Sequence, residues 1–237
     1  MKTLVCAFAY NENEKIKKVI QSTLYAKLHT KYQWDFLVAD DGSTDESLDQ
    51  IPKGVLILKN NKRSGIGNMM KKVFQYVIDN KYDAIICMAG NYKDLPSEID
   101  RLIEKAEEGY DFVQGSRYMK GGLYAGMPIS RIIATKWIHP LLCSFVSGKR
   151  LTESTNGFRL IKTNVLLDKR IDWKQSWLNQ YQLEPYVLIK AIQLGYKHTE
   201  VPVSKLYPTK TTTKMTGFQP YWDMVEAPIC LMLGVRK

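Results

Sequence analysis

The sequence predicts an α/β protein in which helices flank a mostly parallel, doubly wound sheet. Through the first half of the chain, apolar runs of strand length alternate with longer helical patterns, as expected of βαβ units. The run at 84–88 is apolar at every position, as in a central parallel strand that is buried on both faces. The length of 237 residues, with 45% hydrophobic and 24% charged residues, fits one globular domain.

The elements of the first half follow from this alternation. Strands are expected at 3–10, 34–40, 55–59, 84–89 and 111–114. Helices are expected between them at 12–28, 66–80 and 96–108. Met69, Val73 and Val77 fall on one face of the second helix. Pro96 suits the first turn of the third helix, because its missing N–H is not needed there.

The pattern is less regular after about residue 118. An amphipathic segment at 129–146 carries Arg131, so it can lie in a membrane interface or pack as a core helix pair, but it should not span a bilayer. A strand is expected at 155–160, a helix at 183–194 and an edge strand at 198–207. The apolar run at 227–233 fits either surface anchoring or core packing. The stretch 201–217 is expected to form a flexible basic loop that holds Lys205, Lys210 and Lys214.

The formal net charge of +10 favours an anionic partner, which composition leaves open among nucleic acid, an acidic membrane surface and a phosphorylated small molecule. Nucleic acid is disfavoured because the basic residues are spread along the chain and no RRM, KH or helix-turn-helix signature occurs. The four cysteines form no CxxC pair, which suits a reducing cytosol. The expected location is therefore the cytoplasm, with contact at the inner face of a membrane as an added possibility.

Polar groups follow directly on several predicted strands, where open α/β sheets bind their ligands. No GxGxxG follows the first strand and no P-loop motif occurs, which disfavours a classical dinucleotide or P-loop site. Asp41 and the residues after it can also be read simply as a helix cap. The strand-end clusters are Tyr10-Asn11-Glu12, Asp40-Asp41, Ala89-Gly90-Asn91 and Gly115-Ser116-Arg117.

These clusters belong to a longer series of motifs that occurs in order along almost the whole chain. The series resembles that of the family 2 glycosyltransferases, which have the GT-A fold, and it is most similar to the dolichyl- or polyprenyl-phosphate sugar transferase branch. The resemblance implies one GT-A domain over 1–237. Residues 1–118 would bind the nucleotide sugar, and 119–237, with the segment 129–146, would face the acceptor. The motifs are 9–12 (AYNE), 38–45 (VADDGSTD), 63–68 (RSGIGN), 115–118 (GSRY), Gly121-Gly122, 155–160 (TNGFRL) and 200–203 (EVPV).

The resemblance also implies roles for individual residues. Asp40 would hydrogen-bond the nucleotide base, Arg117 would meet phosphate, and Arg117 with Arg131 would position the acceptor. Lys214 would close over the diphosphate, with an exposed lysine on a mobile loop as the plainer interpretation. The remaining contacts to the nucleotide sugar would come from Ala9, Tyr10, Glu12, Asp41, Gly65, Ala89 and Gly90.

One departure from the family pattern concerns metal binding. The family usually carries a DxD motif that holds Mg²⁺ or Mn²⁺ on the diphosphate, and the aligned residues here are Ala89-Gly90-Asn91. Two carboxylate ligands are thereby lost, although Asp94 lies nearby. We assign no metal ligand and give catalytic roles to Asn91 and to Lys93, whose positive charge would stand in for the cation. The alternative, a weak Mg²⁺ or Mn²⁺ site that Asp94 joins, stays open.

Two acceptors fit the resemblance. A polyprenyl phosphate oxygen would attack the anomeric carbon with inversion, and it needs no strong base because it is already ionised. A saccharide hydroxyl, as in surface polysaccharide synthesis, needs a base. Glu153 is the candidate base, unless it only pairs with Arg159. A third alternative is a relative that binds nucleotide sugars without catalysis.

Overall fold

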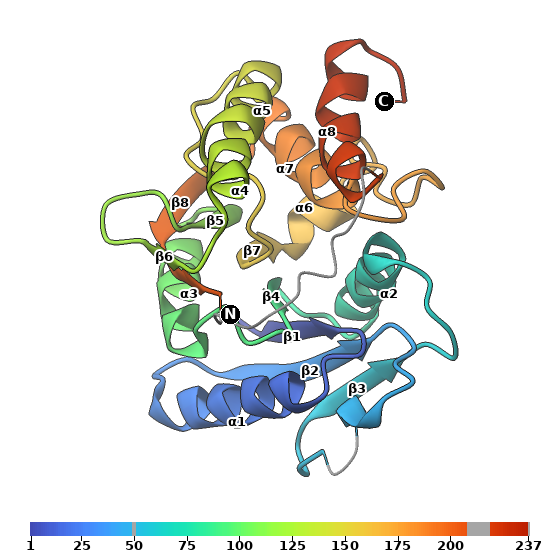
Figure 1. Cartoon of the computed structure of the whole chain (residues 1–237), viewed down its shortest axis with the longest axis vertical. Coiled ribbons are helices and arrows are strands. Elements are labelled where there is room, and N and C mark those ends of the chain that lie inside the picture. The colour runs from blue at the N-terminus through green and yellow to red at the C-terminus, as the bar shows by residue number, and fades with distance from the viewer. Residues whose placement is uncertain (49–50, 208–218, 237) are drawn as a thin grey trace.

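A seven-stranded sheet forms the centre of the protein, in the order β3-β2-β1-β4-β7-β5-β8 (Figure 1). The computed structural model describes residues 1–48, 51–207 and 219–236. Neighbouring strands pair in parallel, except that β7 is antiparallel to both β4 and β5. Both halves of the chain contribute strands to this one sheet. The strands are β1 (Thr3–Ala9), β2 (Trp34–Asp40), β3 (Leu56–Lys59), β4 (Ala84–Ala89), β5 (Phe112–Ser116), β7 (Arg159–Lys162) and β8 (His198–Pro202).

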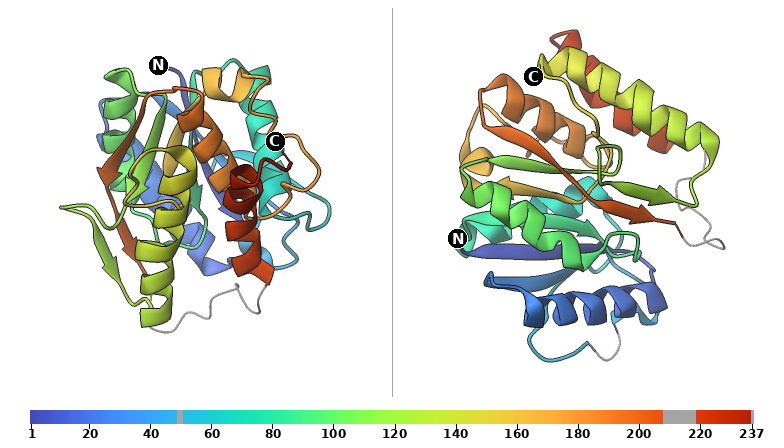
Figure 2. Two further views of the ribbon diagram at one scale, coloured as in Figure 1. Left: turned by 90° about the horizontal axis from the view of Figure 1, so that it is seen from above. Right: turned by 90° about the vertical axis from the view of Figure 1, so that its left-hand side faces the viewer.

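Helices cover both faces of the sheet, because the strands are apolar on both sides (Figure 2). In β1, Val5 and Ala7 pack toward one pair of helices, α1 (Glu14–His29) and α3 (Ile99–Glu107), the latter preceded by the 3-10 turn η2 (Pro96–Glu98). Leu4 and Cys6 belong to the core on the opposite face. That face is covered by α2 (Ile66–Asp79), α6 (Thr163–Leu167) and α7 (Leu183–Gln193). The predicted α/β class and the strands and helices of the first half are confirmed.

Outside this core, the expected amphipathic segment forms a helical rod of three consecutive elements. These are α4 (Ile129–Ile133), the π-helical turn η3 (Ala134–Ile138) and α5 (His139–Ser147). The π turn ends two residues before Pro140. The proline has no N–H to donate one turn back, and its ring clashes with the carbonyl there, which disfavours regular α-helical geometry in that turn. The rod packs through α5 on α7 and on the last helix, α8 (Gln219–Met232) (Figure 1).

Two expectations for the second half were wrong in detail. The strand expected at 155–160 begins only at Arg159, because Asn156 Oδ1 accepts the Phe158 backbone N–H in a local turn. Within the loop expected at 201–217, the residues up to Leu206 are instead strands. The edge strand β8 is followed by β9 (Ser204–Leu206), which pairs in parallel with β6 (Leu123–Ala125). Lys210 and Lys214 lie outside the described residues.

The apolar run at 227–233 lies in α8 as far as Met232. The sequence analysis predicted no helix here, and α8 contains Pro228 in its interior. Ala227 is fully buried, whereas Leu233 at the end of the run is exposed. The run therefore packs on the core at its start and reaches solvent at its end. In the described part of the chain, no helix is both long and apolar enough to cross a membrane.

Candidate active site

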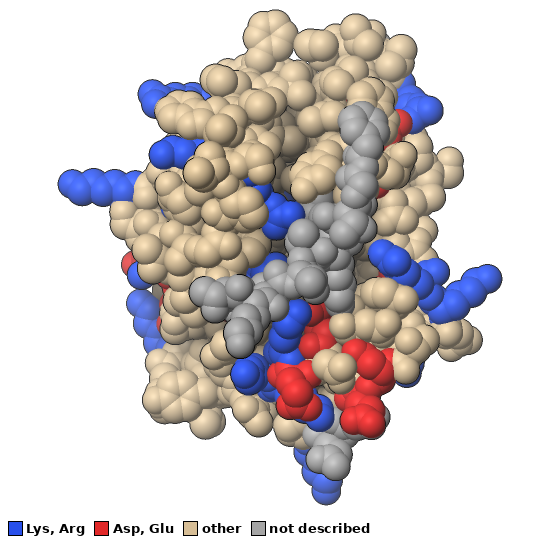
Figure 3. All heavy atoms as spheres, in the orientation of Figure 1, with Lys and Arg blue, Asp and Glu red and all other residues tan. Residues whose placement is uncertain are grey.

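A cavity of about 300 Å³ lies at the carboxyl ends of β1, β2 and β4, where the parallel sheet was expected to bind its ligand. It is bounded on the other side by α4 and by the loop that precedes α7. Lys and Arg side chains gather around the hollow in the middle of this face (Figure 3). The predicted site residues that line the cavity are Ala9, Tyr10, Glu12, Asp41, Ala89, Asn91, Lys93 and Arg131.

The two aspartates at the end of β2 have different surroundings. Asp40 is fully buried and its carboxylate accepts hydrogen bonds from the backbone N–H and the hydroxyl of Ser43. Asp41 lines the cavity and accepts the backbone N–H groups of Ser64, at 2.9 Å, and Gly65, at 2.8 Å. Asp40 therefore holds the turn after β2, and Asp41 joins this turn to the start of α2.

Gly65 does not line the cavity itself, but its place in the turn requires a glycine. Its φ of 101° is in the left-handed region. A Cβ on Gly65 would lie 2.4 Å from the side-chain nitrogen of Gln180 and 2.6 Å from the Asn179 carbonyl oxygen. The glycine thus lets the start of α2 approach the loop before α7 closely enough to close one end of the cavity.

An aromatic and cationic pair lies at that end. The Arg63 guanidinium lies 4.6 Å from the centre of the Tyr10 ring, and both side chains line the cavity. Glu12 forms an ion pair with Lys15 at 3.6 Å. A planar ring beside a guanidinium suits a nucleobase or its ribose. The sequence pattern singled out Tyr10, but it gave Arg63 no role.

The other end of the cavity is strongly basic. Lys93 Nζ lies 4.4 Å from the centre of the Tyr207 ring, and Arg131 Cζ lies 5.8 Å from the same centre. Burial, with the positive charges of Lys205 and Arg131, lowers the pKa of Lys93 to about 8. Burial is the larger cause of this lowering, and the neighbouring cations add to it. The positions of Lys93 and Arg131 against one ring put positive charge at this end, as a site for a polyanion requires.

Asp94 belongs to this end of the structure but does not face the cavity. It is buried, and one carboxylate oxygen lies 2.6 Å from Lys205 Nζ while the other accepts the Ala89 backbone N–H at 2.9 Å. Both oxygens of Asp94 are thus engaged in hydrogen bonds within the protein. Gly90 also lies behind the cavity, where a Cβ would come within 2.7 Å of the Phe8 carbonyl oxygen.

Arg117 and Glu153 form a buried ion pair behind the cavity, with 2.7 Å between Nε and Oε2. Burial acts to raise the pKa of Glu153, but the Arg117 charge and hydrogen bonds from Thr155 outweigh it and hold the pKa below its ordinary value. Arg117 also donates to the Tyr207 hydroxyl at 3.4 Å. The alternative partner proposed for Glu153 was wrong, because Arg159 pairs instead with Glu184 at 3.2 Å.

The structure thus divides the predicted site into residues that face the cavity and residues that support it. Asp40, Gly65, Gly90, Arg117 and Glu153 support it, and Lys214 lies outside the described residues. The other polar residues that line it were given no role from the sequence, since they come from scattered loops, helices and an edge strand. They are Lys15, Arg63, Thr155, Gln180, Tyr181, Glu184, Lys205 and Tyr207.

The fold is that of nucleotide-sugar transferases of the GT-A class. The chain is similar over 100% of its length to a crystal structure of glucosyl-3-phosphoglycerate synthase from Mycobacterium tuberculosis, determined with Mn²⁺, UDP and glucosyl-3-phosphoglycerate. The TM-score is 0.67, the sequence identity is 17%, and 81% of that chain is covered.

The chain belongs to glycosyl transferase family 2, whose family model matches residues 4–173, and it is therefore a glycosyltransferase. It is 26% identical to a polyprenol monophosphomannose synthase from Mycolicibacterium smegmatis, over 91% of this chain and 82% of that protein. It is 25% identical to an undecaprenyl-phosphate 4-deoxy-4-formamido-L-arabinose transferase from Klebsiella pneumoniae, over 82% of this chain and 56% of that protein. These similarities support the resemblance drawn from the motifs, including the branch.

Proposed function

We propose that this glycosyltransferase moves a sugar from a nucleotide-diphosphate sugar to a polyprenyl phosphate, with inversion at the anomeric carbon. One observation favours a lipid acceptor over a saccharide: the rod 129–147 contributes residues both to the wall of the cavity and to an exposed apolar surface. Arg131 of the rod lines the cavity, while Ile133, Leu141 and Phe145 of the same rod are exposed. One helix can therefore meet the phosphate and the lipid chain of a single acceptor.

The donor would lie along the cavity with its nucleoside at the Tyr10–Arg63 end and its diphosphate at the Lys93 end. At the nucleoside end, the Asp41 carboxylate accepts hydrogen bonds from the backbone N–H groups of Ser64 and Gly65, which hold it in place. The proposed order places the anionic part of the donor where the cations gather. Asn91 also lines the cavity, and its neutral amide can hydrogen-bond the sugar.

The transfer needs little proton chemistry when the acceptor is a phosphate. A phosphate oxygen forms the new bond to the anomeric carbon, and the bond from that carbon to the distal phosphate oxygen of the donor breaks. The leaving nucleoside diphosphate takes the electron pair. No proton has to be removed from the attacking oxygen, so the buried and ionised Glu153 is free to hold Arg117 in place rather than to act as a base.

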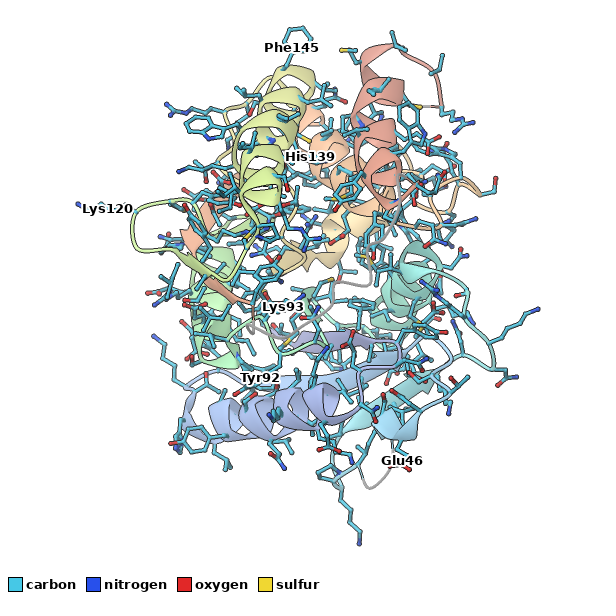
Figure 4. The ribbon with its side chains drawn as sticks, in the orientation of Figure 1. Glu46, Tyr92, Lys93, Lys120, His139 and Phe145 are labelled. Carbon is cyan, nitrogen blue, oxygen red and sulfur yellow. The ribbon has the colours of Figure 1, made fainter. Side chains whose placement is uncertain are left out.

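The exposed side of the rod fits a membrane surface. Ile129, Ile133, Trp137, Leu141 and Phe145 recur every four residues along it, which puts them on one side of the rod. Phe145 points outward at the end of α5 (Figure 4). Lys136 within the rod and Arg150 just after it supply positive charge for anionic head groups. We place the enzyme at the cytoplasmic face of the membrane, held there peripherally.

The proposal is tested by supplying radiolabelled UDP- and GDP-sugars together with undecaprenyl phosphate in detergent. The expected product is a labelled lipid that partitions into organic solvent and releases its sugar in mild acid. A parallel reaction offers oligosaccharides without the lipid. Label transferred to the oligosaccharides and not to the lipid would overturn the choice of acceptor and restore the saccharide alternative.

A further inference from the structure

The resemblance to family 2 glycosyltransferases implies metal-binding carboxylates in the loop after β4, and this chain has other residues there. The aligned residues are Ala89 and Asn91, so at most one neutral amide oxygen replaces two carboxylates. The remaining carboxylate of this loop, Asp94, is occupied by Lys205 and by a backbone N–H. Among residues 1–48, 51–207 and 219–236, no group of His, Cys, Asp and Glu side chains is arranged to hold a metal ion. The donor set therefore does not fit Mg²⁺ or Mn²⁺, which prefer carboxylate oxygens.

Cationic side chains gather at the same place. The loop that carries Lys93 is tied to β9, because the Leu206 backbone N–H donates to the Lys93 carbonyl oxygen at 3.0 Å. The next residue of the loop, Asp94, is paired with Lys205 in β9. Tyr207 follows β9, and its ring lies against both Lys93 and Arg131. Residues from the β4 loop, β9 and α4 thus converge on one end of the cavity.

The backbone before Lys93 is held in a conformation that aromatic residues seldom adopt. Tyr92 has a φ of 59°, in the left-handed region. Asp94 stabilises this turn from both sides through the Ala89 N–H and the Lys205 ammonium. Lys93 lies in the middle of the molecule, between the sheet and α4 (Figure 4). A strained and well-anchored turn that presents a lysine to the cavity points to a fixed task for that lysine.

We propose that this enzyme binds and uses its sugar nucleotide without a divalent cation, and that Lys93, beside Arg131 and the Asp94–Lys205 pair, contacts the diphosphate directly. The inference rests on the proposed donor. When the bond between the anomeric carbon and the distal phosphate oxygen breaks, the electron pair goes to that oxygen. The Lys93 ammonium supplies the compensating charge. Asp94 and Lys205 act as positioning residues that fix the turn.

Diphosphate binding to protein that has been treated with EDTA and desalted is the first test. Calorimetric titration with inorganic pyrophosphate probes the basic end of the cavity without assuming which base the enzyme prefers. Lys93→Gln is expected to weaken this binding roughly tenfold or more, as expected when a charge-assisted contact is lost. The matched control Lys120→Gln removes the same charge from an exposed loop and should leave binding unchanged (Figure 4). Equal affinities for wild type and Lys93→Gln would overturn the inference.

The second test compares UDP and GDP, each titrated into wild-type protein with Mn²⁺ and without it. We expect Mn²⁺ to give no more than a twofold gain in affinity. A gain of tenfold or more would overturn the inference while leaving the proposed function standing. Failure of the wild type to bind any of these diphosphates, or the corresponding sugar nucleotides, under either condition would overturn the proposed function as well.

A designed variant tests the same idea in the opposite direction. Ala89→Asp combined with Asn91→Asp and Lys93→Gln restores carboxylates and removes the competing charge. In the presence of UDP or GDP, this triple variant should bind Mn²⁺ and reduce the electron paramagnetic resonance signal of the free ion, whereas wild type should not. A wild-type protein that reduces the signal as strongly as the variant would contradict the proposal. If the triple variant does not fold, as judged by its thermal unfolding, the Lys93→Gln and wild-type titrations decide.

Discussion

Lys93 and Asp94 are neighbours in the chain, yet the structure gives them opposite surroundings. Lys93 lines the cavity, whereas Asp94 is buried beneath it and paired with Lys205. A negative charge beside Lys93 in sequence therefore does not neutralise it in the site. Instead, Asp94 neutralises a second lysine and fixes the turn from which Lys93 reaches the cavity.

The ionisation of Lys93 leads to a prediction about pH. Its pKa is about 8, set by burial and by Lys205, Arg131 and Lys15, with Glu12 acting in the opposite direction. A bound diphosphate favours the charged lysine, so binding takes up a proton when the pH is above 8. Affinity for pyrophosphate should therefore fall as pH rises from 8 to 9, by up to about tenfold for one linked proton. Calorimetric titrations across this range measure the fall.

The control for this pH series is Lys93→Arg, because a guanidinium stays charged throughout the range. Its affinity should be nearly constant between pH 7 and pH 9. A variant that lost affinity as steeply as wild type would show that another group causes the pH dependence.

Replacement of Glu153 tests whether it is structural. Glu153→Gln leaves the Arg117 guanidinium buried without its carboxylate partner, which should lower the free energy of unfolding by about 3–5 kcal/mol. Urea unfolding followed by circular dichroism measures the loss. Glu107→Gln, at an exposed position of α3, is the matched control and should change stability little. An unchanged stability in Glu153→Gln, together with loss of transfer, would favour Glu153 as a base instead.

At the scale of elements, the rod made by α4, η3 and α5 joins the cavity to the surface. Its exposed side chains are larger and more apolar than an ordinary solvated helix face carries, while Cys143 and His139 on its other side are buried. The π turn η3 lies between the part that carries Arg131 and the part that packs on α7. The rod can thus keep one side on the protein and present the other to lipid.

Membrane binding should depend on this exposed side. The double variant Leu141→Ser, Phe145→Ser removes two exposed apolar side chains and should weaken binding to phosphatidylglycerol vesicles roughly tenfold or more, since each buried side chain of this size contributes about 1.5–3 kcal/mol. Its melting temperature should be unchanged because both positions are exposed. Co-sedimentation with vesicles measures the effect.

The control is Leu28→Ser, at an equally exposed position near the end of α1, which should bind vesicles like wild type. Weaker vesicle binding by this control variant would contradict the assignment of the membrane surface to the rod.

For the whole molecule, the two halves of the chain are joined by one sheet. The antiparallel strand β7 from the second half pairs with β4 from the first, and β5 pairs with β7 and β8. The cavity also takes residues from both halves, including Tyr10, Lys93, Arg131 and Tyr207. The second half of the chain should therefore not unfold independently of the first.

This arrangement predicts a single unfolding transition that a ligand raises as a whole. The preferred nucleoside diphosphate at about 100 times its dissociation constant should add about 2.7 kcal/mol to the free energy of unfolding, with EDTA present. Differential scanning calorimetry with and without the ligand measures the shift. Two transitions, of which only one moved, would show that the halves fold separately.

The outline of the fold could be read from the sequence because strand and helix periods are local properties. The strands at 34–40 and 84–89 were predicted with the bounds that the structure shows. In the second half, contacts between residues far apart in the sequence decided where strands and helices form. Residues 204–206 form a strand because β6 is available beside them, and α8 forms despite Pro228 because its Ala227 side packs on the core.

The sequence by itself determined the class of sheet, the edge of the sheet at which the cavity lies and the ordered motifs of the family, with Ala89-Gly90-Asn91 in place of its DxD. Tertiary structure alone decided that Asp41 rather than Asp40 faces the cavity, that Glu153 pairs with Arg117, and that Lys205 joins Asp94 across 111 residues of chain. The physical reason is the sequence separation over which each property is determined. Hydrophobic periodicity depends on residues that are neighbours along the chain. The partner of a buried charge is set instead by the crossing of distant strands and loops.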